Sequence, residues 1–320
     1  MALEKIIIVT RKTRLQELIE RFNTKAQARF YIEHAGGSFS DYELEDDEYR
    51  RSFDQLNRSL DVGLKLQVID RDFLPTFMFM PQDIIVTLGQ DGLVANAAKY
   101  VKGQPIIAVN PSPRIFDGVL LPFLTAGAVG AVDRLLHEKA TLRDVTMAEA
   151  KLSDGQQLLA FNDLFIGPKT HVSARYRIAW GGKSEPQSSS GVLVSTGAGS
   201  TGWLSSIFNM TRGVATLANM TRGVATLAGK TLGSTAHMEW EDLRLVFVVR
   251  EPFASKHSQA QIVAGMIAPG EELVLESLMP AGGVIFSDGT EADFLQFNSG
   301  VTAVVKASDQ KAHLVMEKAA

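Results

Sequence analysis

The sequence contains no cysteine in its 320 residues. It can therefore form no disulfide, offer no thiolate to a metal and use no cysteine nucleophile, which agrees with a reducing compartment. It also lacks an apolar run of about 18 residues, so neither a membrane-spanning helix nor a membrane partner is predicted. The opening residues, MALEKIIIVT, lead straight into a predicted strand and match neither a signal peptide nor a transit segment, so we expect a cytoplasmic protein.

The sequence lacks the clusters of charged residues that mark nucleic-acid sites and the histidine spacings that mark metal sites. The net charge is −4, no basic block occurs, and the acidic run EDDE at 45–48 stands alone, so we expect no nucleic-acid partner. The six histidines stand singly, with no two spaced for one helix face, which argues against a histidine-based metal site. A chain of this length and ordinary composition has room for two domains.

The first third of the chain alternates strand and helix patterns. Apolar, β-rich runs predict strands at 5–9, 64–69, 84–87 and 105–109. Apolar residues at helical spacing predict helices at 15–26 and 41–61. This alternation predicts a doubly wound α/β domain, in which ligands bind outside the carboxyl ends of the strands.

The pattern changes after a predicted helix at 128–137. Short β-type runs follow, separated by turn pairs such as Asp154-Gly155 and Asp288-Gly289, and they predict an antiparallel β-sandwich. We therefore expect an α/β domain at 1–122 and a β-sandwich domain at 123–320, with the last segment able to return to the first domain.

Ten residues, NMTRGVATLA, occur twice in tandem at 209–218 and 219–228. Repeat architectures need three or more longer units, so this duplication does not predict a solenoid. Ten extra residues in a helix would turn its downstream face by about −80°. One copy bulges out, or the duplication is recent and poorly accommodated, or it is an artefact of sequence assembly, and the sequence alone does not choose among these.

Residues 84–98, IIVTLGQDGLVANAA, place a turn bracketed by Gly89 and Gly92 between a buried strand and a helix. Backbone N–H groups at such a turn and at a helix N-terminus favour a phosphate. A carboxylate repels phosphate, so Asp91 would have a separate task, such as accepting a proton or helping to hold Mg²⁺. The alternative is an ordinary strand-to-helix turn. Arg14, with Arg11 and Lys12 at the start of the first helix, either adds to a phosphate site or forms a solvated basic turn.

A second loop follows a predicted strand at 192–194. Except for Ala198, every residue from Ser195 to Gly202 is a glycine or carries a hydroxyl. Side chains this small let a ligand approach the main chain, and the hydroxyl and N–H groups supply hydrogen bonds. A flexible surface loop is the alternative reading.

The order of these motifs resembles that of NAD kinases, in particular the branch that includes the mitochondrial-type enzyme. The motifs are Gly89–Gly92, FNDLFIG at 161–167, SSGVLVSTGAGSTGW at 189–203, VREPF at 249–253 and SDGTEADFLQFNSG at 287–300. The resemblance covers roughly residues 83–310. It implies an α/β domain and a β-sandwich domain with the active site between them. It also implies transfer of the γ-phosphoryl of ATP, carried with Mg²⁺, to the 2′-hydroxyl of the adenosine ribose of NAD.

The resemblance also implies roles for individual residues. Asp91 would be the catalytic base that receives the proton of the 2′-hydroxyl, while Gly89 and Gly92, with Gln90 between them, would leave room for the phosphates of ATP. Arg14 is assigned to the same phosphates from its place at the start of the first helix, apart from the resemblance. Asn162 and Asp163 correspond to an Asn-Glu pair that holds the adenine and ribose. The remaining NAD-binding residues would be Asn110, Thr196, Gly197, Gly199, Ser200 and Thr201. The alternative for Asn110 and Asn162 is that they are turn residues. No protein side chains are assigned as metal ligands, and we expect a homodimer or higher homo-oligomer.

The chain departs from the family pattern at four positions. Gln90 stands where glycine is usual, Leu93 and Ala198 stand where threonine is usual, and Asp163 stands where glutamate is usual. These changes could weaken catalysis or change the phosphoryl donor. The alternatives are a non-catalytic dinucleotide-binding or sensor protein on the same fold, or a kinase that acts on a lipid or a sugar. The donor, ATP or polyphosphate, and the preference for NAD or NADH stay open.

Overall fold

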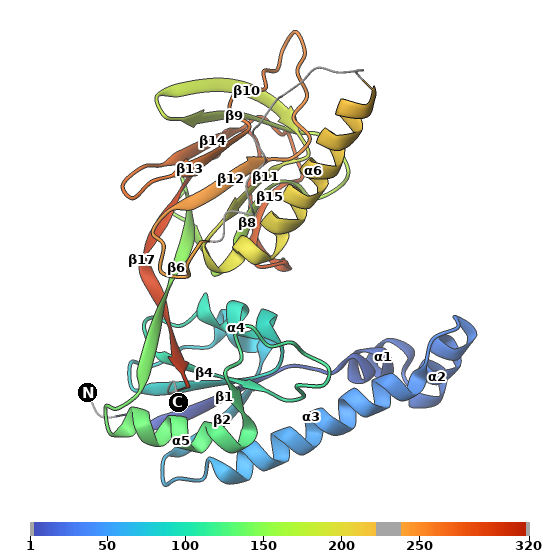
Figure 1. Cartoon of the computed structure of the whole chain (residues 1–320), viewed down its shortest axis with the longest axis vertical. Helices are drawn as coiled ribbons and strands as arrows, with labels where there is room; N and C mark the ends of the chain where they lie inside the picture. The colour runs from blue at the N-terminus through green and yellow to red at the C-terminus, as the bar shows by residue number, and fades with distance from the viewer. Residues whose placement is uncertain (1–2, 222–237, 318–320) are drawn as a thin grey trace. The chain divides into compact units, whose positions relative to one another are not determined.

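The computed structural model describes residues 3–221 and 238–317. The chain folds into two compact units, one formed by Met1–Arg143 together with Ala312–Ala320 and the other by Asp144–Lys311 (Figure 1). The first unit contains a parallel sheet with the strand order β2-β1-β3-β4. Its strands are β1 (Lys5–Thr10), β2 (Lys65–Asp70), β3 (Asp83–Leu88), β4 (Pro105–Asn110) and the short β5 (Phe123–Leu124).

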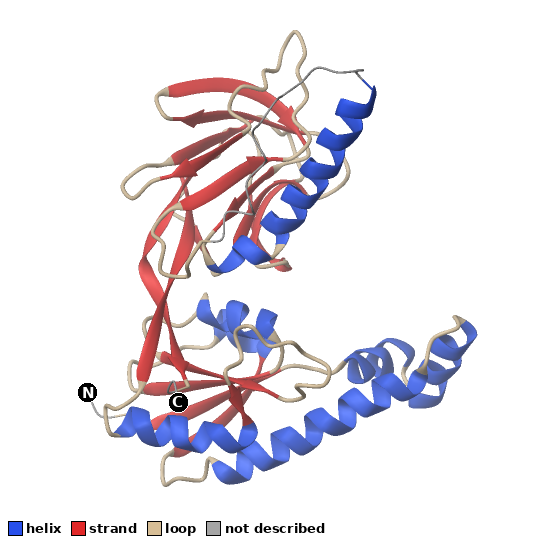
Figure 2. Ribbon diagram, viewed as in Figure 1, coloured by secondary structure: helices blue, strands red, loops and turns tan. Residues whose placement is uncertain are grey.

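Strand β3 is buried at every residue, as expected for an apolar strand inside a parallel sheet covered on both faces. Helices α3 and α5 cover one face of this sheet, and α4 lies on the other (Figure 2). Ile84 and Val86 of β3 pack with Leu56 of α3 and Val132 of α5. The helices of the unit are α1 (Arg14–Phe22), α2 (Lys25–His34), α3 (Phe39–Ser59), the 3₁₀ turn η1 (Arg71–Thr76), α4 (Asp91–Ala98) and α5 (Thr125–Leu136).

The helix predicted over 15–26 is two helices. Helix α1 ends at Asn23, whose φ of 63° is left-handed, and the Thr24 side chain then caps α2. A left-handed residue ends a helix, and asparagine is one of the few residue types that tolerate it. Apolar spacing alone did not reveal the break.

The second unit is a sandwich of two antiparallel sheets. One sheet has the order β13-β12-β11-β8-β15-β16, and the other contains β10-β9-β14-β17 with β6 and β7 attached. Their inner faces share a core that includes Ile166, Tyr176, Phe247 and Leu275. The strands are β6 (Thr141–Leu152), β7 (Gln157–Ala160), β8 (Asp163–Pro168), β9 (Ala174–Trp180), β10 (Lys183–Ser189), β11 (Val192–Ser195), β12 (Leu245–Val249), β13 (Ala264–Ile267), β14 (Leu273–Ser277), β15 (Gly283–Ser287), β16 (Thr290–Gln296) and β17 (Thr302–Met316).

The division between the units differs from the one expected at 122/123. The first unit extends through Arg143, because α5 packs Ala128, Ala131 and Val132 into the core of the parallel sheet. The long strand β17 begins in the second unit, where it pairs with β14, and His313 then pairs with Pro105 of β4 in the first. The expected α/β and β-sandwich classes are both present.

Helix α6 (Trp203–Thr221) carries the first copy of the tandem repeat. Leu204 and Ile207, which precede the repeat, pack against Leu193 of β11. Within the first copy, Met210 and Val214 are more than half exposed. As far as Val214, where the description of its side chains ends, the first copy is exposed, and most of the second copy lies outside the described residues. No helix in the described part of the chain is long and apolar enough to cross a membrane.

Candidate functional site

The turn at Gly89–Gly92 joins the end of β3 to the start of α4, as predicted. Gln90 is the N-cap of α4, with φ −89° and ψ 169°, and it is exposed. This extended backbone is open to any residue, so glycine is not required at this position. At position 89, in contrast, glycine is favoured by packing, because a Cβ there would lie 2.8 Å from Cδ2 of Leu93. The Leu93 side chain therefore packs against Gly89.

Asp91 is the first residue of α4 and is partly buried. Its Oδ1 accepts a hydrogen bond of 2.6 Å from the backbone N–H of Leu120. No other hydrogen bond is recorded for its side chain within the described residues, which leaves Oδ2 available to a ligand. The carboxylate is thus held in one orientation while one oxygen can still accept a proton.

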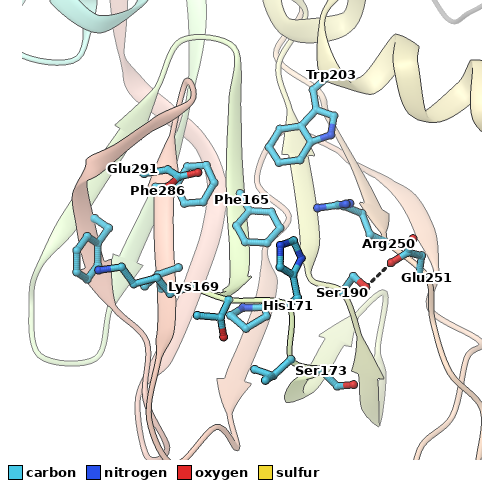
Figure 3. A pocket seen from close by; sticks show the side chains of 15 residues that line it. Phe165, Lys169, His171, Ser173, Ser190, Trp203, Arg250, Glu251, Phe286 and Glu291 are labelled. Atoms are coloured by element: carbon cyan, nitrogen blue, oxygen red, sulfur yellow. Dashed lines mark hydrogen bonds between the residues drawn. The ribbon is translucent and has the colours of Figure 1, made fainter. Parts of the chain in front are cut away.

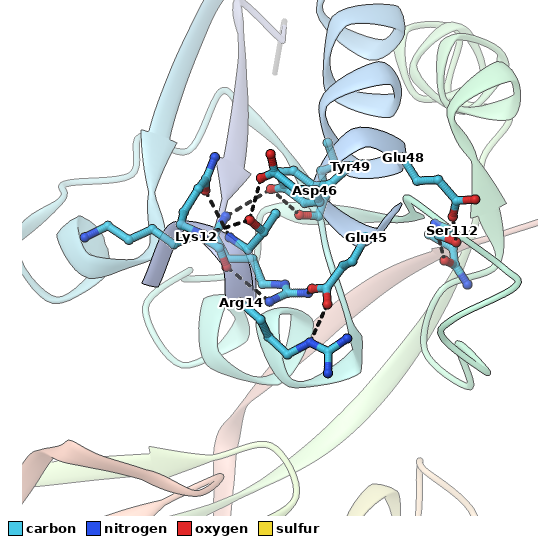
Figure 4. Close-up of polar contacts among 12 residues, drawn as sticks. Lys12, Arg14, Glu45, Asp46, Glu48, Tyr49 and Ser112 are labelled. Atoms are coloured by element: carbon cyan, nitrogen blue, oxygen red, sulfur yellow. Dashed lines mark hydrogen bonds and ion pairs between the residues drawn. The ribbon is translucent and has the colours of Figure 1, made fainter. Parts of the chain in front are cut away.

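The basic residues at the start of α1 are each paired with an acid. Glu45 of α3 accepts from Nη2 of Arg11 at 3.0 Å and also from Nε of Arg14 (Figure 4). Lys12 binds Glu20 at 2.9 Å. The Arg11 side chain is buried, whereas that of Arg14 is half exposed. A phosphate at Arg14 would therefore have to share this cation with Glu45.

Helix α3 ties together the loops at the carboxyl edge of the parallel sheet. The hydroxyl of Tyr49 accepts from the N–H of Arg11 and donates to the carbonyl of Leu88, so it bridges the ends of β1 and β3. On the same helix, Glu48 bonds to Ser112 after β4 (Figure 4). Burial raises the pKa of Tyr49 to about 12, which keeps its hydroxyl protonated and able to donate. We did not predict this role from the sequence, although Glu45, Glu48 and Tyr49 have the spacing of one helix face.

Asn110 lies at the end of β4 and is buried. Its amide donates to the carbonyl of Phe116, and its Oδ1 accepts from the N–H of Ser112. Gly118, with φ 70°, passes so close that a Cβ would lie 2.6 Å from the Asn110 amide nitrogen. In this structure the side chain organises the loop after β4, in line with the turn reading of this asparagine.

In the second unit, the loop after β11 packs against the segment before β8. The Thr196 hydroxyl donates to the carbonyl of Phe161 at 2.6 Å, and its N–H donates to the carbonyl of Asn162. A Cβ on Gly199 would lie 2.1 Å from the Asn162 oxygen, and one on Gly197 would lie 1.9 Å from the backbone oxygen of Glu239. Glycine is therefore required at 197 and 199, because a side chain at either position would clash with the backbone of a neighbouring segment.

Two further loop residues differ in accessibility. Ser200 is buried, and its hydroxyl donates to the Gly197 carbonyl within the short 3₁₀ turn η2 (Ala198–Thr201). Thr201, at the end of that turn, is exposed. Of the loop positions assigned to NAD, Thr201 offers the most accessible hydroxyl, whereas Thr196 and Ser200 already have protein partners.

Asp288 fixes the Asn162-Asp163 pair. Its carboxylate accepts from the backbone N–H groups of Phe161, Asn162 and Asp163 at 3.0, 2.6 and 3.2 Å. Asp288 has a left-handed φ of 53° at the hairpin between β15 and β16. This residue was missed as part of the site, although the Asp-Gly pair was read as a turn. The structure thus brings Asn162, Asp163, Thr196 and Gly199 together in one cluster.

The Asp163 side chain is buried beside this cluster. Burial, reinforced by the negative charge of Asp288, raises the pKa of Asp163 to about 7. The carboxyl group is therefore partly protonated at neutral pH. Asn162 is partly exposed, and its side-chain amide has no recorded partner within the described residues.

We expect Asp163 to make the protein less stable as the pH rises from about 4 to 7. Over this range the carboxyl ionises in the unfolded chain but not in the folded one, so the folded state is favoured at the acidic end. The full loss, from a pKa difference of about 3, is about 4 kcal/mol. Urea unfolding at several pH values should show this slope in the wild type and a flatter one in Asp163→Asn. The exposed Asp61→Asn serves as the control, and equal slopes in the wild type and Asp163→Asn would contradict the assignment.

A cavity of about 710 Å³ lies on the second unit, outside the predicted site (Figure 3). Its walls include Phe165, Trp203, Arg250 and Phe286. Three of these residues lie in the sequence motifs FNDLFIG, SSGVLVSTGAGSTGW and VREPF, but nothing in the spacing indicated that they meet. The pairing of β8 with β11 and β15, and of β11 with β12, brings them together.

Comparison with known proteins identifies similar structures but no sequence family. No family model matches, and no curated protein sequence matches. Two solved structures are similar. A yeast NADH kinase complexed with NADH has a TM-score of 0.57 and 16% identity, covering 99% of this chain and 84% of that one. An NAD kinase from Archaeoglobus fulgidus in complex with ATP has a TM-score of 0.52 and 13% identity, covering 98% and 94%. The expected fold class is therefore confirmed: this chain has the fold of these kinases.

Proposed function

We propose that this protein is a kinase that transfers the γ-phosphoryl group of Mg-ATP to the 2′-hydroxyl of the adenosine ribose of NAD. The oxygen of that hydroxyl forms a bond to the γ-phosphorus, its proton passes to Asp91, and the bond from the γ-phosphorus to the bridging oxygen breaks to release ADP. Mg²⁺ would arrive on the nucleotide, since this ion is usually coordinated largely by substrate phosphates.

The observation that carries the proposal is the position of Asp91 and the hydrogen bond that orients its carboxylate. It follows a buried parallel strand at the first position of a helix, where anionic ligands are favoured, and its orientation is fixed by Leu120. Such a carboxylate suits the removal of a proton beside a phosphate. The second unit would recognise NAD through Asn162 and Asp163, since an amide can pair with a purine edge and a carboxylate can accept from ribose hydroxyls.

The test is incubation of the purified chain with Mg-ATP and NAD, followed by detection of NADP. NADH, polyphosphate, diacylglycerol and sugars run in parallel would determine the acceptor and the donor. We also propose that the protein is a homodimer or higher homo-oligomer and that it is most similar to the branch of NAD kinases that includes the mitochondrial-type enzyme. Measuring its molecular mass in solution would test the oligomeric state. Binding of NAD without turnover under every condition would favour the dinucleotide-binding or sensor alternative.

Gln90 should have little influence on this reaction. Because its backbone is extended and its side chain is exposed, Gln90→Gly should change kcat/KM by less than about tenfold, or about 1.4 kcal/mol. Steady-state kinetics of the two proteins would measure this. A gain of a hundredfold would show that the glutamine obstructs the phosphate turn and that the native protein is an impaired enzyme.

A further inference from the structure

The cavity on the second unit has an aromatic wall. The ring centroid of Phe165 lies 4.9 Å from that of Phe286 and 5.7 Å from that of Trp203 (Figure 3). These residues come from β8, β15 and the start of α6. Together they form a continuous aromatic surface on the side of the sheet away from the core of the sandwich.

Two glycines make room for this wall. Added Cβ atoms at Gly167 and Gly191 would each lie 2.7 Å from the ring of Phe165. Gly167 is on β8 with Phe165, and Gly191 precedes the neighbouring strand β11. The ring therefore lies where side chains at those two positions would otherwise stand, and any larger residue there would push it into the cavity.

Two cations lie beside aromatic rings of the cavity, Arg250 at the aromatic wall and Lys169 at Phe294, a further lining residue. The guanidinium of Arg250 lies 5.3 Å from the Trp203 ring and 5.8 Å from the Phe165 ring, and the Lys169 ammonium lies 4.8 Å from the ring of Phe294. Across the described residues, neither cation has a carboxylate within ion-pair distance. The nearby Glu251 is bonded to Ser190. The other acid of the cavity, Glu291, is exposed.

We propose that this cavity is a binding site for a nucleoside phosphate, separate from the Asn162-Asp163 cluster. The base would stack on the partly exposed rings of Trp203 and Phe286, because Phe165 between them is only 5% exposed. The phosphate would meet Arg250 and Lys169, which have no carboxylate within ion-pair distance among the described residues. The volume falls in the range of small-molecule sites. Binding here does not require the proposed phosphoryl transfer.

The experiment is calorimetric titration of the full chain with AMP, with adenosine and ribose 5-phosphate as partial ligands. AMP should bind at least about tenfold more tightly than either, because each lacks one of the two recognised groups. Arg250→Gln should weaken AMP binding at this site by at least about tenfold, and the exposed Lys169→Gln should weaken it measurably. Lys183→Gln, an exposed lysine on β10, is the matched control and should change nothing. Thermal melting checks that Arg250→Gln folds.

Asn162→Ala separates this site from the proposed NAD site, which would also accept AMP. If both sites exist, the wild type binds two AMP molecules, and Arg250→Gln and Asn162→Ala each remove a different one. If the NAD proposal fails, the wild type binds one AMP molecule, and only Arg250→Gln and Lys169→Gln weaken that binding. Unchanged AMP binding in both cavity variants would overturn the present inference. So would ribose 5-phosphate binding as tightly as AMP, which would indicate a bare phosphate site.

Discussion

Asp91→Asn should lower kcat for NAD phosphorylation by roughly 10² to 10⁴, the range expected for loss of a general base. The amide oxygen can still accept from the Leu120 N–H, so the turn and the helix start should keep their structure. What the variant loses is the ability to take a proton. Binding of NAD, measured by titration, should stay within a few-fold of the wild type.

Asp117→Asn is the matched control, because Asp117 is exposed in the same loop that supplies Leu120. It should leave kcat unchanged. If Asp91→Asn turned over at the wild-type rate, Asp91 would have no part in the mechanism and the proton would need another acceptor.

Gly199→Ala should destabilise the second unit by at least about 3 kcal/mol. The new methyl group would lie 2.1 Å from the backbone oxygen of Asn162, and a backbone atom cannot turn aside as a side chain can. For a unit of this size the melting temperature should fall by roughly 6 to 12 °C. Differential scanning calorimetry would measure the change.

Gly92→Ala provides the comparison. Nothing lies within 4 Å of a Cβ at Gly92, which is inside α4, so alanine should be neutral or slightly stabilising there. A melting temperature for Gly199→Ala equal to that of the wild type would mean that the loop can move away from the β8 segment, and that its packing does not define the Asn162-Asp163 cluster.

The sequence predicted most of the elements because burial leaves a local pattern. Runs such as Ile84–Val86 are apolar because both faces of β3 are covered, and that pattern can be read without knowing the neighbours. The division at 122/123 was misplaced for the opposite reason. Helix α5 follows a stretch rich in turn residues, and only its packing on the parallel sheet shows that it belongs to the first unit.

The sequence predicted the parts of the candidate site that consist of residues adjacent in the chain. It did not predict the parts formed by contacts between segments that are distant in the chain. The turn at Gly89–Gly92 and the Gly/Ser loop could be found from composition and spacing. The bonds from Asp288 to the 161–163 backbone join segments more than 120 residues apart, so no spacing rule indicates them. The same holds for Glu45, whose pairing with Arg14 changes what that arginine can offer to a phosphate.

Strand β17 has a consequence for the order in which the chain can fold. Its residues Leu314 and Val315 are buried in the first unit, next to strands that precede them by about two hundred residues. During synthesis the core of the first unit is therefore completed only after the β-sandwich, which precedes Leu314 and Val315 in the chain, has left the ribosome. Contacts so distant in sequence slow folding and prolong exposure to aggregation. A cell that makes this protein would have reason to hold the nascent first unit on a chaperone.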